Sequence, residues 1–131
     1  MKNKINLACI IDDDPIFVFG TKKMMQYTGF CETFLIFKNG KEALDHLSII
    51  LIEKKSIPDI IFLDINMPVM DGWQFLEEIT KIDISETLKI FLVTSSETQE
   101  DRKKAQQFSA IKNYVVKPIT MEGLKDLLPK I

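Results

Sequence analysis

The sequence contains few of the residues that build disulfide, thiol or histidine chemistry. Its 131 residues include two cysteines and one histidine. Cys9 lies inside an apolar run and Cys31 precedes another, a spacing that fits neither a metal-ligand motif nor a redox pair. We expect both to be reduced, structural thiols. His46 falls within a helical pattern beside Asp45, far in sequence from the acidic clusters, and we interpret it as an ordinary helix residue rather than a phosphodonor.

Long hydrophobic runs and a large excess of either charge are also absent. The first apolar segment, Ile5–Ile11, is too short for the core of a secretion signal or for a membrane span, so we expect a cytoplasmic protein without a membrane partner. The net charge is −2 with acids and bases interspersed, and no basic stripe indicates nucleic acid. The length suits one domain, which we expect to occupy residues 1–131 without an output domain.

Five short apolar runs alternate along the chain with longer helical patterns. Several of the runs lack an inside/outside alternation, which is typical of parallel strands that helices cover on both faces. This order predicts an α/β fold with a doubly wound, five-stranded parallel sheet and five helices. The predicted strands are Ile5–Ile11, Thr33–Phe37, Asp59–Leu63, Lys89–Val93 and Asn113–Val116.

Each predicted helix begins at a recognisable capping residue. Asp14 precedes Pro15, which suits the first position of a helix, and Asn39, Asp71 and Thr120 can cap three of the others. The stretch from Ser96 to Gln99 matches a capping box for a polar helix.

Polar side chains follow four of the five predicted strands. In a doubly wound sheet, a ligand site forms beyond the carboxyl ends of the strands, so these side chains should converge on one edge. Taken singly, each has an ordinary interpretation as a turn, a cap or a solvated residue, and their joint placement is what favours a site. The residues are Asp12 and Asp13, Asp64, Thr94 and Ser95, and Lys117.

These side chains form a chemically coherent set. Three carboxylates at one edge repel each other and raise one another's pKa unless a cation neutralises them, which favours a hard divalent ion such as Mg²⁺. The hydroxyl of Thr94 and the ammonium of Lys117 both suit phosphoryl oxygens. A carboxylate such as Asp64 can itself be a nucleophile and form an aspartyl phosphate.

With these residues in view, the chain resembles the receiver domains of two-component response regulators over essentially its whole length. Four blocks in order, each at the end of a predicted strand, make the resemblance specific, and it implies a flavodoxin-like sheet of order 2-1-3-4-5. The blocks are Ile11-Asp12-Asp13-Asp14-Pro15, Leu63-Asp64-Ile65-Asn66-Met67-Pro68-Val69-Met70-Asp71-Gly72, Val93-Thr94-Ser95-Ser96 and Tyr114-Val115-Val116-Lys117-Pro118.

The resemblance implies a role for each acidic residue. Asp64 would be the phosphoacceptor, with a sensor histidine kinase, a histidine phosphotransfer protein or a small donor such as acetyl phosphate supplying the phosphoryl group. Asp13 would bind Mg²⁺ directly and Asp12 largely through a water, and the backbone carbonyl of Asn66 would complete the protein ligands together with Asp64.

It also implies a signalling mechanism. Lys117 would pair with the Asp64 carboxylate and then with the phosphoryl group, and Thr94 would donate a hydrogen bond to a phosphoryl oxygen. Movement of Thr94 would free space for Tyr114 and bias a partner-binding surface on the fourth helix, fifth strand and fifth helix. Tyr114 could instead be a plain strand aromatic.

Two other classes of protein are compatible with parts of this pattern. A phosphohydrolase of the haloacid dehalogenase type needs a second carboxylate two residues after its nucleophile, where this chain has Asn66. A receiver-like domain that only binds partners should have lost site residues, and none is missing. We therefore expect a phosphorylation-dependent switch that is not a conventional enzyme, with a phosphorelay intermediate or a phosphate sink as alternatives. The stretch Phe108–Ile111 departs from the Gly-Ala step of many receivers and leaves the conformation of that loop open.

Overall fold

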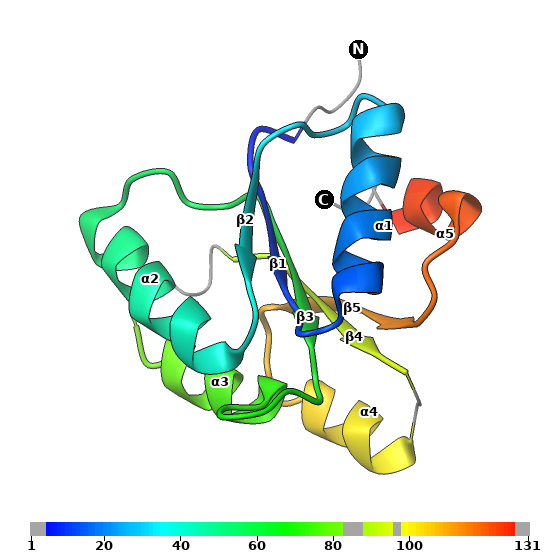
Figure 1. The fold of residues 1–131 in the computed structure, drawn as a ribbon. Coiled ribbons are helices and arrows are strands. Elements are labelled where there is room, and N and C mark those ends of the chain that lie inside the picture. Colours follow the sequence, from blue (N-terminus) through cyan, green and yellow to red (C-terminus); the bar gives the residue numbers. More distant parts are fainter. Residues whose placement is uncertain (1–4, 83–87, 96–97, 128–131) are drawn as a thin grey trace.

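A computed structural model describes residues 5–82, 88–95 and 98–127. Its five strands form one parallel sheet of order β2-β1-β3-β4-β5 (Figure 1), which confirms the predicted fold class and strand order. The first predicted strand was too long, because the structure begins it three residues later, and the fifth begins two residues earlier than predicted. The strands are β1 (Ala8–Ile11), β2 (Phe34–Phe37), β3 (Ile60–Asp64), β4 (Ile90–Thr94) and β5 (Ile111–Val116).

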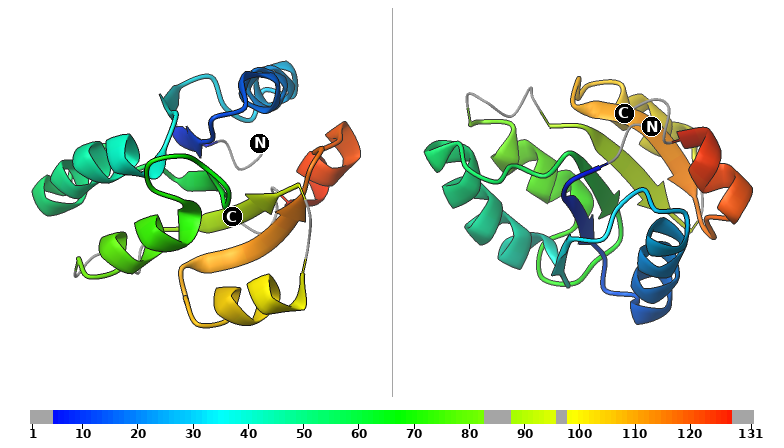
Figure 2. Two further views of the ribbon diagram at one scale, coloured as in Figure 1. Left: turned by 60° about the horizontal axis from the view of Figure 1, so that its bottom comes forward. Right: turned by 90° about the horizontal axis from the view of Figure 1, so that it is seen from above.

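Helices cover both faces of the sheet. They pack in two groups on opposite faces of the sheet (Figures 1 and 2). None of the helices in the described ranges has the length and apolarity needed to cross a membrane. The first face carries α1 (Pro15–Tyr27) and α5 (Met121–Leu127), and the second carries α2 (Gly40–Glu53), α3 (Gly72–Ile79) and α4 (Gln99–Ala105).

The helix starts follow the capping chemistry expected from the sequence. The side chains of Asp14 and Asn39 accept hydrogen bonds from backbone N–H groups in the first turns of α1 and α2, and Asp71 forms a capping box at α3. The predicted box from Ser96 falls partly outside the described residues. Within them, Thr98 caps α4 through the N–H of Asp101, 3.0 Å away.

The central strands are buried on both sides of the sheet. Every residue of β1, β3 and β4 is buried, so these strands bury side chains against helices on both faces and need no alternation. The outer strands β2 and β5 are only partly buried. Cys9 and Cys31 are both free and fully buried, which agrees with the structural role expected for them.

Candidate functional site

The sheet register brings the carboxyl ends of the strands to one edge. Ile11 pairs with Leu63, so the next residues of the two central strands, Asp12 and Asp64, lie side by side. Thr94 pairs with Val116 at the other side of Asp64, and the N–H of Lys117 donates a hydrogen bond to the carbonyl of Thr94 at 2.7 Å. The structure therefore assembles the four strand ends that the sequence singled out.

Three carboxylates meet at this edge. One oxygen from each of Asp12, Asp13 and Asp64 lies within 4.8 Å of the other two. Asp12 and Asp64 are only 2% and 4% exposed, whereas Asp13 is open to solvent. Two buried carboxylates and one accessible carboxylate form an oxygen cluster of the kind that a hard divalent cation prefers.

Burial and mutual repulsion change the protonation of the buried pair. Burial, followed by the charge of Asp12, raises the pKa of Asp64 to about 7, against the opposing effect of Lys117. Burial also raises the pKa of Asp12, although the N–H of Asp14 donates a hydrogen bond to its Oδ1 at 2.9 Å. The Oδ2 of Asp12 is buried and has no hydrogen-bond partner among the described residues. The close carboxylates and the raised pKa values fit a cluster that a cation completes.

Lys117 is the cation of the site, and three carboxylates share it. Its Nζ lies 3.0 Å from Oδ2 of Asp12, without hydrogen-bond geometry, and 3.9 Å from Oδ1 of Asp64. It also lies 3.8 Å from Oδ2 of Asp14, which the sequence suggested only as a helix cap. The ring of Phe17 stands beneath the ammonium, with its centroid 4.8 Å from Nζ. The lysine therefore sits nearer to Asp12 than to Asp64, the partner that the family resemblance suggested.

The loop after β3 holds the Asp64 backbone in place. The N–H of Gly72 donates to the carbonyl of Ile65 at 2.8 Å and draws the start of α3 onto the end of the strand. The backbone N–H of Asn66 donates to the Asp64 carboxylate and lowers its pKa slightly against the effect of burial. Val69 has a positive φ of 69° and is spanned by a hydrogen bond from Met70 N–H to the carbonyl of Pro68 at 2.7 Å.

Thr94 and Tyr114 lie on neighbouring strands of the same sheet. Thr94 is fully buried at the end of β4, and Tyr114 lies on β5, where it pairs with Leu92 two pairs before the Thr94–Val116 pair. The Tyr114 hydroxyl is buried without a hydrogen-bond partner among the described residues, and burial raises its pKa. The guanidinium of Arg102 from α4 stands 5.1 Å from the centroid of the Tyr114 ring. Tyr114 is therefore positioned between the strand ends and α4.

Two aromatic residues, His46 and Trp73, lie outside this group. His46 is exposed on α2, where Nδ1 lies 3.0 Å from the carbonyl oxygen of Glu42 and the ring packs against Phe37 at 5.2 Å. Trp73 on α3 stacks on Phe108 in the α4–β5 connection, with ring centroids 6.3 Å apart. The contacts of His46 are those of a helix surface residue, as expected.

Comparison with known proteins gives a consistent answer. The family model for the response regulator receiver domain matches residues 8–129. Chemotaxis protein CheY-3 of Vibrio cholerae is 30% identical over 129 residues, which are 98% of this chain and 93% of the relative. A crystal structure of a two-component response regulator from Cytophaga hutchinsonii has a TM-score of 0.86 at 29% identity, covering 97% and 96% of the two chains. The receiver domain of a Pseudomonas aeruginosa sensor histidine kinase, solved with a magnesium ion in its active-site cleft, has a TM-score of 0.77 at 20% identity, covering 97% and 96%.

Proposed function

Because the chain belongs to the response regulator receiver domain family, we propose that it accepts a phosphoryl group on Asp64 and thereby switches a partner-binding surface. Proteins of this family are signalling proteins that interact with histidine kinases and phosphotransfer proteins. The observation that carries the proposal is the position of Asp64, a buried carboxylate at the end of β3 with an oxygen within 4.8 Å of oxygens of Asp12 and Asp13 and with Oδ1 3.9 Å from the ammonium of Lys117. The donor is a sensor histidine kinase, a histidine phosphotransfer protein or acetyl phosphate.

In the transfer step, a carboxylate oxygen of Asp64 attacks phosphorus and a P–O bond forms. With phosphohistidine as donor the P–N bond breaks and the imidazole nitrogen keeps the electron pair, and with acetyl phosphate the P–O bond breaks and acetate leaves. Lys117 offsets the charge on the transferred oxygens, and the Thr94 hydroxyl donates a hydrogen bond to one of them. Catalysis is therefore mostly positioning and neutralisation of charge.

The acidic cluster would hold Mg²⁺. Asp13 and Asp64 would bind the ion through carboxylate oxygens, Asp12 would act largely through a water, and Asn66 would contribute its backbone carbonyl. When bound, the ion supplies positive charge to the acceptor and phosphoryl oxygens. The close approach of the three carboxylates and the burial of Asp12 and Asp64 support this assignment. The magnesium ion in the Pseudomonas aeruginosa receiver domain supports it by analogy.

Loss of the phosphoryl group is self-directed hydrolysis. Water attacks phosphorus, the bond to the Asp64 oxygen breaks with its electron pair on that oxygen, and the carboxylate, inorganic phosphate and one proton released to solvent are the products. Asn66 cannot act as a general acid or base at the position where a haloacid dehalogenase-type hydrolase has a carboxylate. The chain therefore turns over its own aspartyl phosphate and is not a conventional phosphohydrolase.

The signal passes from Thr94 to Tyr114. Because no hydrogen bond within the described residues fixes the Tyr114 hydroxyl, the ring can change position when Thr94 moves toward the phosphoryl group. The responding surface comprises α4, β5 and α5. This surface binds a partner protein, and the relay and phosphate-sink roles are the alternatives.

Intact-mass analysis after incubation with acetyl phosphate and Mg²⁺ tests the acceptor. We expect one acid-labile phosphoryl adduct on the wild type and none on Asp64→Asn. Asp45→Asn is a matched control, because Asp45 is an exposed carboxylate on α2 that pairs with Lys41 on the same helix. An unmodified wild-type protein with acetyl phosphate and with kinase donors would refute the proposal, whereas steady turnover of an added phosphate ester would favour a hydrolase.

A binding experiment separates a switch from a sink. Partner capture with and without beryllofluoride should differ for the wild type, and Tyr114→Ala should reduce that difference. Unchanged coupling in Tyr114→Ala would remove this residue from the mechanism, and equal capture in both states would favour the sink.

A further inference from the structure

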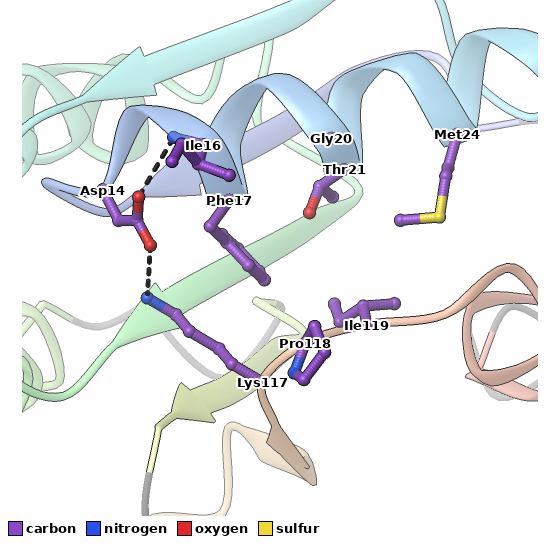
Figure 3. Close-up of a pocket in the computed structure, with 9 residues that line it drawn as sticks. All are labelled: Asp14, Ile16, Phe17, Gly20, Thr21, Met24, Lys117, Pro118 and Ile119. Atoms are coloured by element: carbon purple, nitrogen blue, oxygen red, sulfur yellow. Dashed lines mark hydrogen bonds and ion pairs between the residues drawn. The ribbon is translucent and has the colours of Figure 1, made fainter.

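Asp14 makes two separate contacts at the start of α1. Its Oδ1 accepts a hydrogen bond from the backbone N–H of Ile16 at 3.0 Å and so caps the helix. Its Oδ2 lies 3.8 Å from the ammonium of Lys117, which directly follows β5. Figure 3 shows the Asp14 side chain between these two partners. One oxygen therefore serves the helix, and the other faces the cation of the candidate site.

The chain segment that contains Asp14 contacts the ammonium of Lys117 in three places. Besides Asp14, Oδ2 of Asp12 lies 3.0 Å from Nζ, and the centroid of the Phe17 ring lies 4.8 Å from it. The acceptor strand β3 supplies Asp64, whose Oδ1 is 3.9 Å away. The contacts from β1 and α1 therefore draw the ammonium toward that side of the site and compete with its approach to Asp64.

Of these three contacts, the one with Asp14 is the easiest to give up. Asp12 belongs to the acidic cluster, and the Phe17 ring is buried in the core beneath α1. The Asp14 side chain is 43% exposed, whereas that of Lys117 is 15% exposed. Water can therefore take the place of the ammonium at the Asp14 carboxylate, and an ion pair with one partner this exposed contributes little. The pair can open without disturbing the fold.

We propose that Asp14 is a positioning residue, which competes with the incoming phosphoryl group for Lys117 and so slows phosphoryl acceptance. This inference rests on the proposed role of Asp64 as the acceptor. When the phosphoryl oxygens approach Asp64, they offer Lys117 stronger charge-assisted hydrogen bonds than a carboxylate 3.8 Å away. The ammonium then leaves Asp14, whose Oδ2 turns to water while its Oδ1 still caps α1.

Asp14→Asn separates the two contacts, because asparagine caps a helix as well as aspartate does but cannot attract an ammonium. We expect this variant to form the acetyl phosphate adduct about 2- to 5-fold faster than the wild type in an intact-mass time course with Mg²⁺. This is the effect of one partly exposed ion pair. Asp45→Asn, which breaks the exposed pair with Lys41, should leave the rate unchanged.

A double-mutant cycle with Lys117→Met shows whether Asp14 acts through the lysine. In the Lys117→Met background there is no ammonium to compete for, so adding Asp14→Asn should not change the rate of adduct formation. If Asp14 acted on the anionic donor through its own charge, the gain would persist in this background. A persistent gain of equal size would therefore overturn the proposal.

The position of Lys117 can also be measured without phosphoryl transfer. Protons above the face of an aromatic ring have upfield chemical shifts, so the ε-methylene protons of Lys117 report how close they are to the Phe17 ring. We expect an upfield shift in the wild type and its loss in Phe17→Leu. In Asp14→Asn the shift should lie nearer to the Phe17→Leu value, because the ammonium is released toward Asp12 and Asp64. A residue that only caps the helix would not affect this shift.

The outcomes distinguish this proposal from the proposed function. An unchanged methylene shift in Asp14→Asn, or no gain in its rate of adduct formation, would overturn the positioning role. The absence of an adduct on the wild type would instead refute Asp64 as the acceptor. If Lys117→Met forms no adduct, the methylene shift alone decides. If Asp14→Asn does not fold, Asp14→Ser takes its place, because serine also caps a helix without carrying a charge.

Discussion

A Cβ atom on Gly72 would stand 2.6 Å from the carbonyl oxygen of Asp64. This contact is with backbone rather than with a flexible side chain, so Gly72→Ala must displace either the start of α3 or the end of β3. We expect a loss of about 1–3 kcal/mol in the free energy of unfolding by urea. We also expect slower acceptance of a phosphoryl group, measured by intact mass, because Asp64 itself moves.

Gly20→Ala is the matched control for this substitution. Gly20 also lies in a helix, but a Cβ there meets nothing within 4 Å. We expect the free energy of unfolding to rise by about 0.5–1 kcal/mol, since alanine is the better helix former. Equal destabilisation by the two substitutions would show that the contact with Asp64 is not the cause of the Gly72 effect.

The raised pKa of Asp64 predicts a pH dependence of stability in the presence of a metal chelator. The folded-state pKa of about 7 exceeds the ordinary value of 3.8, so the folded protein binds more protons than the unfolded chain between these pH values. The stabilisation is complete below the ordinary value and is lost as the pH rises through about 7. Urea unfolding at pH 5 and pH 8 should therefore show a smaller decrease for Asp64→Asn than for the wild type, and identical decreases would contradict the assignment.

Replacing Lys117 should change how strongly magnesium stabilises the protein. In Lys117→Met the side-chain stem remains, but Asp12 and Asp64 lose their positive neighbour. At pH 8 without metal we expect the free energy of unfolding to fall by about 1–3 kcal/mol. This loss is smaller than for a buried ion pair that stays fully charged, because the two carboxylates can take up protons. Adding MgCl₂ should raise the melting temperature more in Lys117→Met than in the wild type, since the metal ion replaces the missing charge.

Lys41→Met provides the control for that experiment. Lys41 pairs with Asp45 at 3.0 Å on the surface of α2, where both side chains are 57% exposed. An exposed pair contributes little, so its removal should change neither the stability nor the magnesium response appreciably. A magnesium response of Lys117→Met no larger than that of Lys41→Met would argue against competition between the lysine and the ion.

The backbone of Val69 predicts a stabilising substitution. A β-branched residue at φ 69° is strained, and the side chain is 79% exposed, so it contributes little packing in return. Val69→Gly should raise the free energy of unfolding by about 1 kcal/mol, because relief of this strain exceeds the added freedom of the unfolded chain. Val69→Ala, which retains a Cβ, should raise the free energy of unfolding by less in the same urea titration.

The sequence predicted the fold well where burial determines the structure. The uniformly apolar strands and the capping residues gave the α/β class and the starts of the first three helices. The first strand was predicted too long because Ile5 is apolar and buried, yet the N–H groups of Asn6 and Leu7 donate to the side chain of Asp59 rather than to a neighbouring strand. Such a long-range contact leaves no local pattern.

The sequence predicted which residues form the candidate site, but not which carboxylate lies nearest to Lys117. The order of strand ends sufficed to bring Asp12, Asp64 and Lys117 together. That Lys117 stands nearest to Asp12 depends on ångström-scale placement of a long side chain, which residue spacing does not determine. The sequence also did not predict that the buried hydroxyl of Thr21 lacks a hydrogen-bond partner among the described residues. A threonine on the inner face of an amphipathic helix normally donates a hydrogen bond to a backbone carbonyl of its own helix.

The burial of β1 and β3 on both faces has a consequence for folding specificity. A strand with one polar face resists a one-residue slip, because slipping would bury its polar residues, but these two strands have no polar face to resist it. Their ends differ from their interiors, since Asp12 and Asp64 lie beside Lys117, and a slip would carry these carboxylates into the apolar core and away from that positive charge. The two aspartates thus act as end stops for the pairing of Ile11 with Leu63. Neutral substitutions intended only to silence the chemistry would also loosen this alignment.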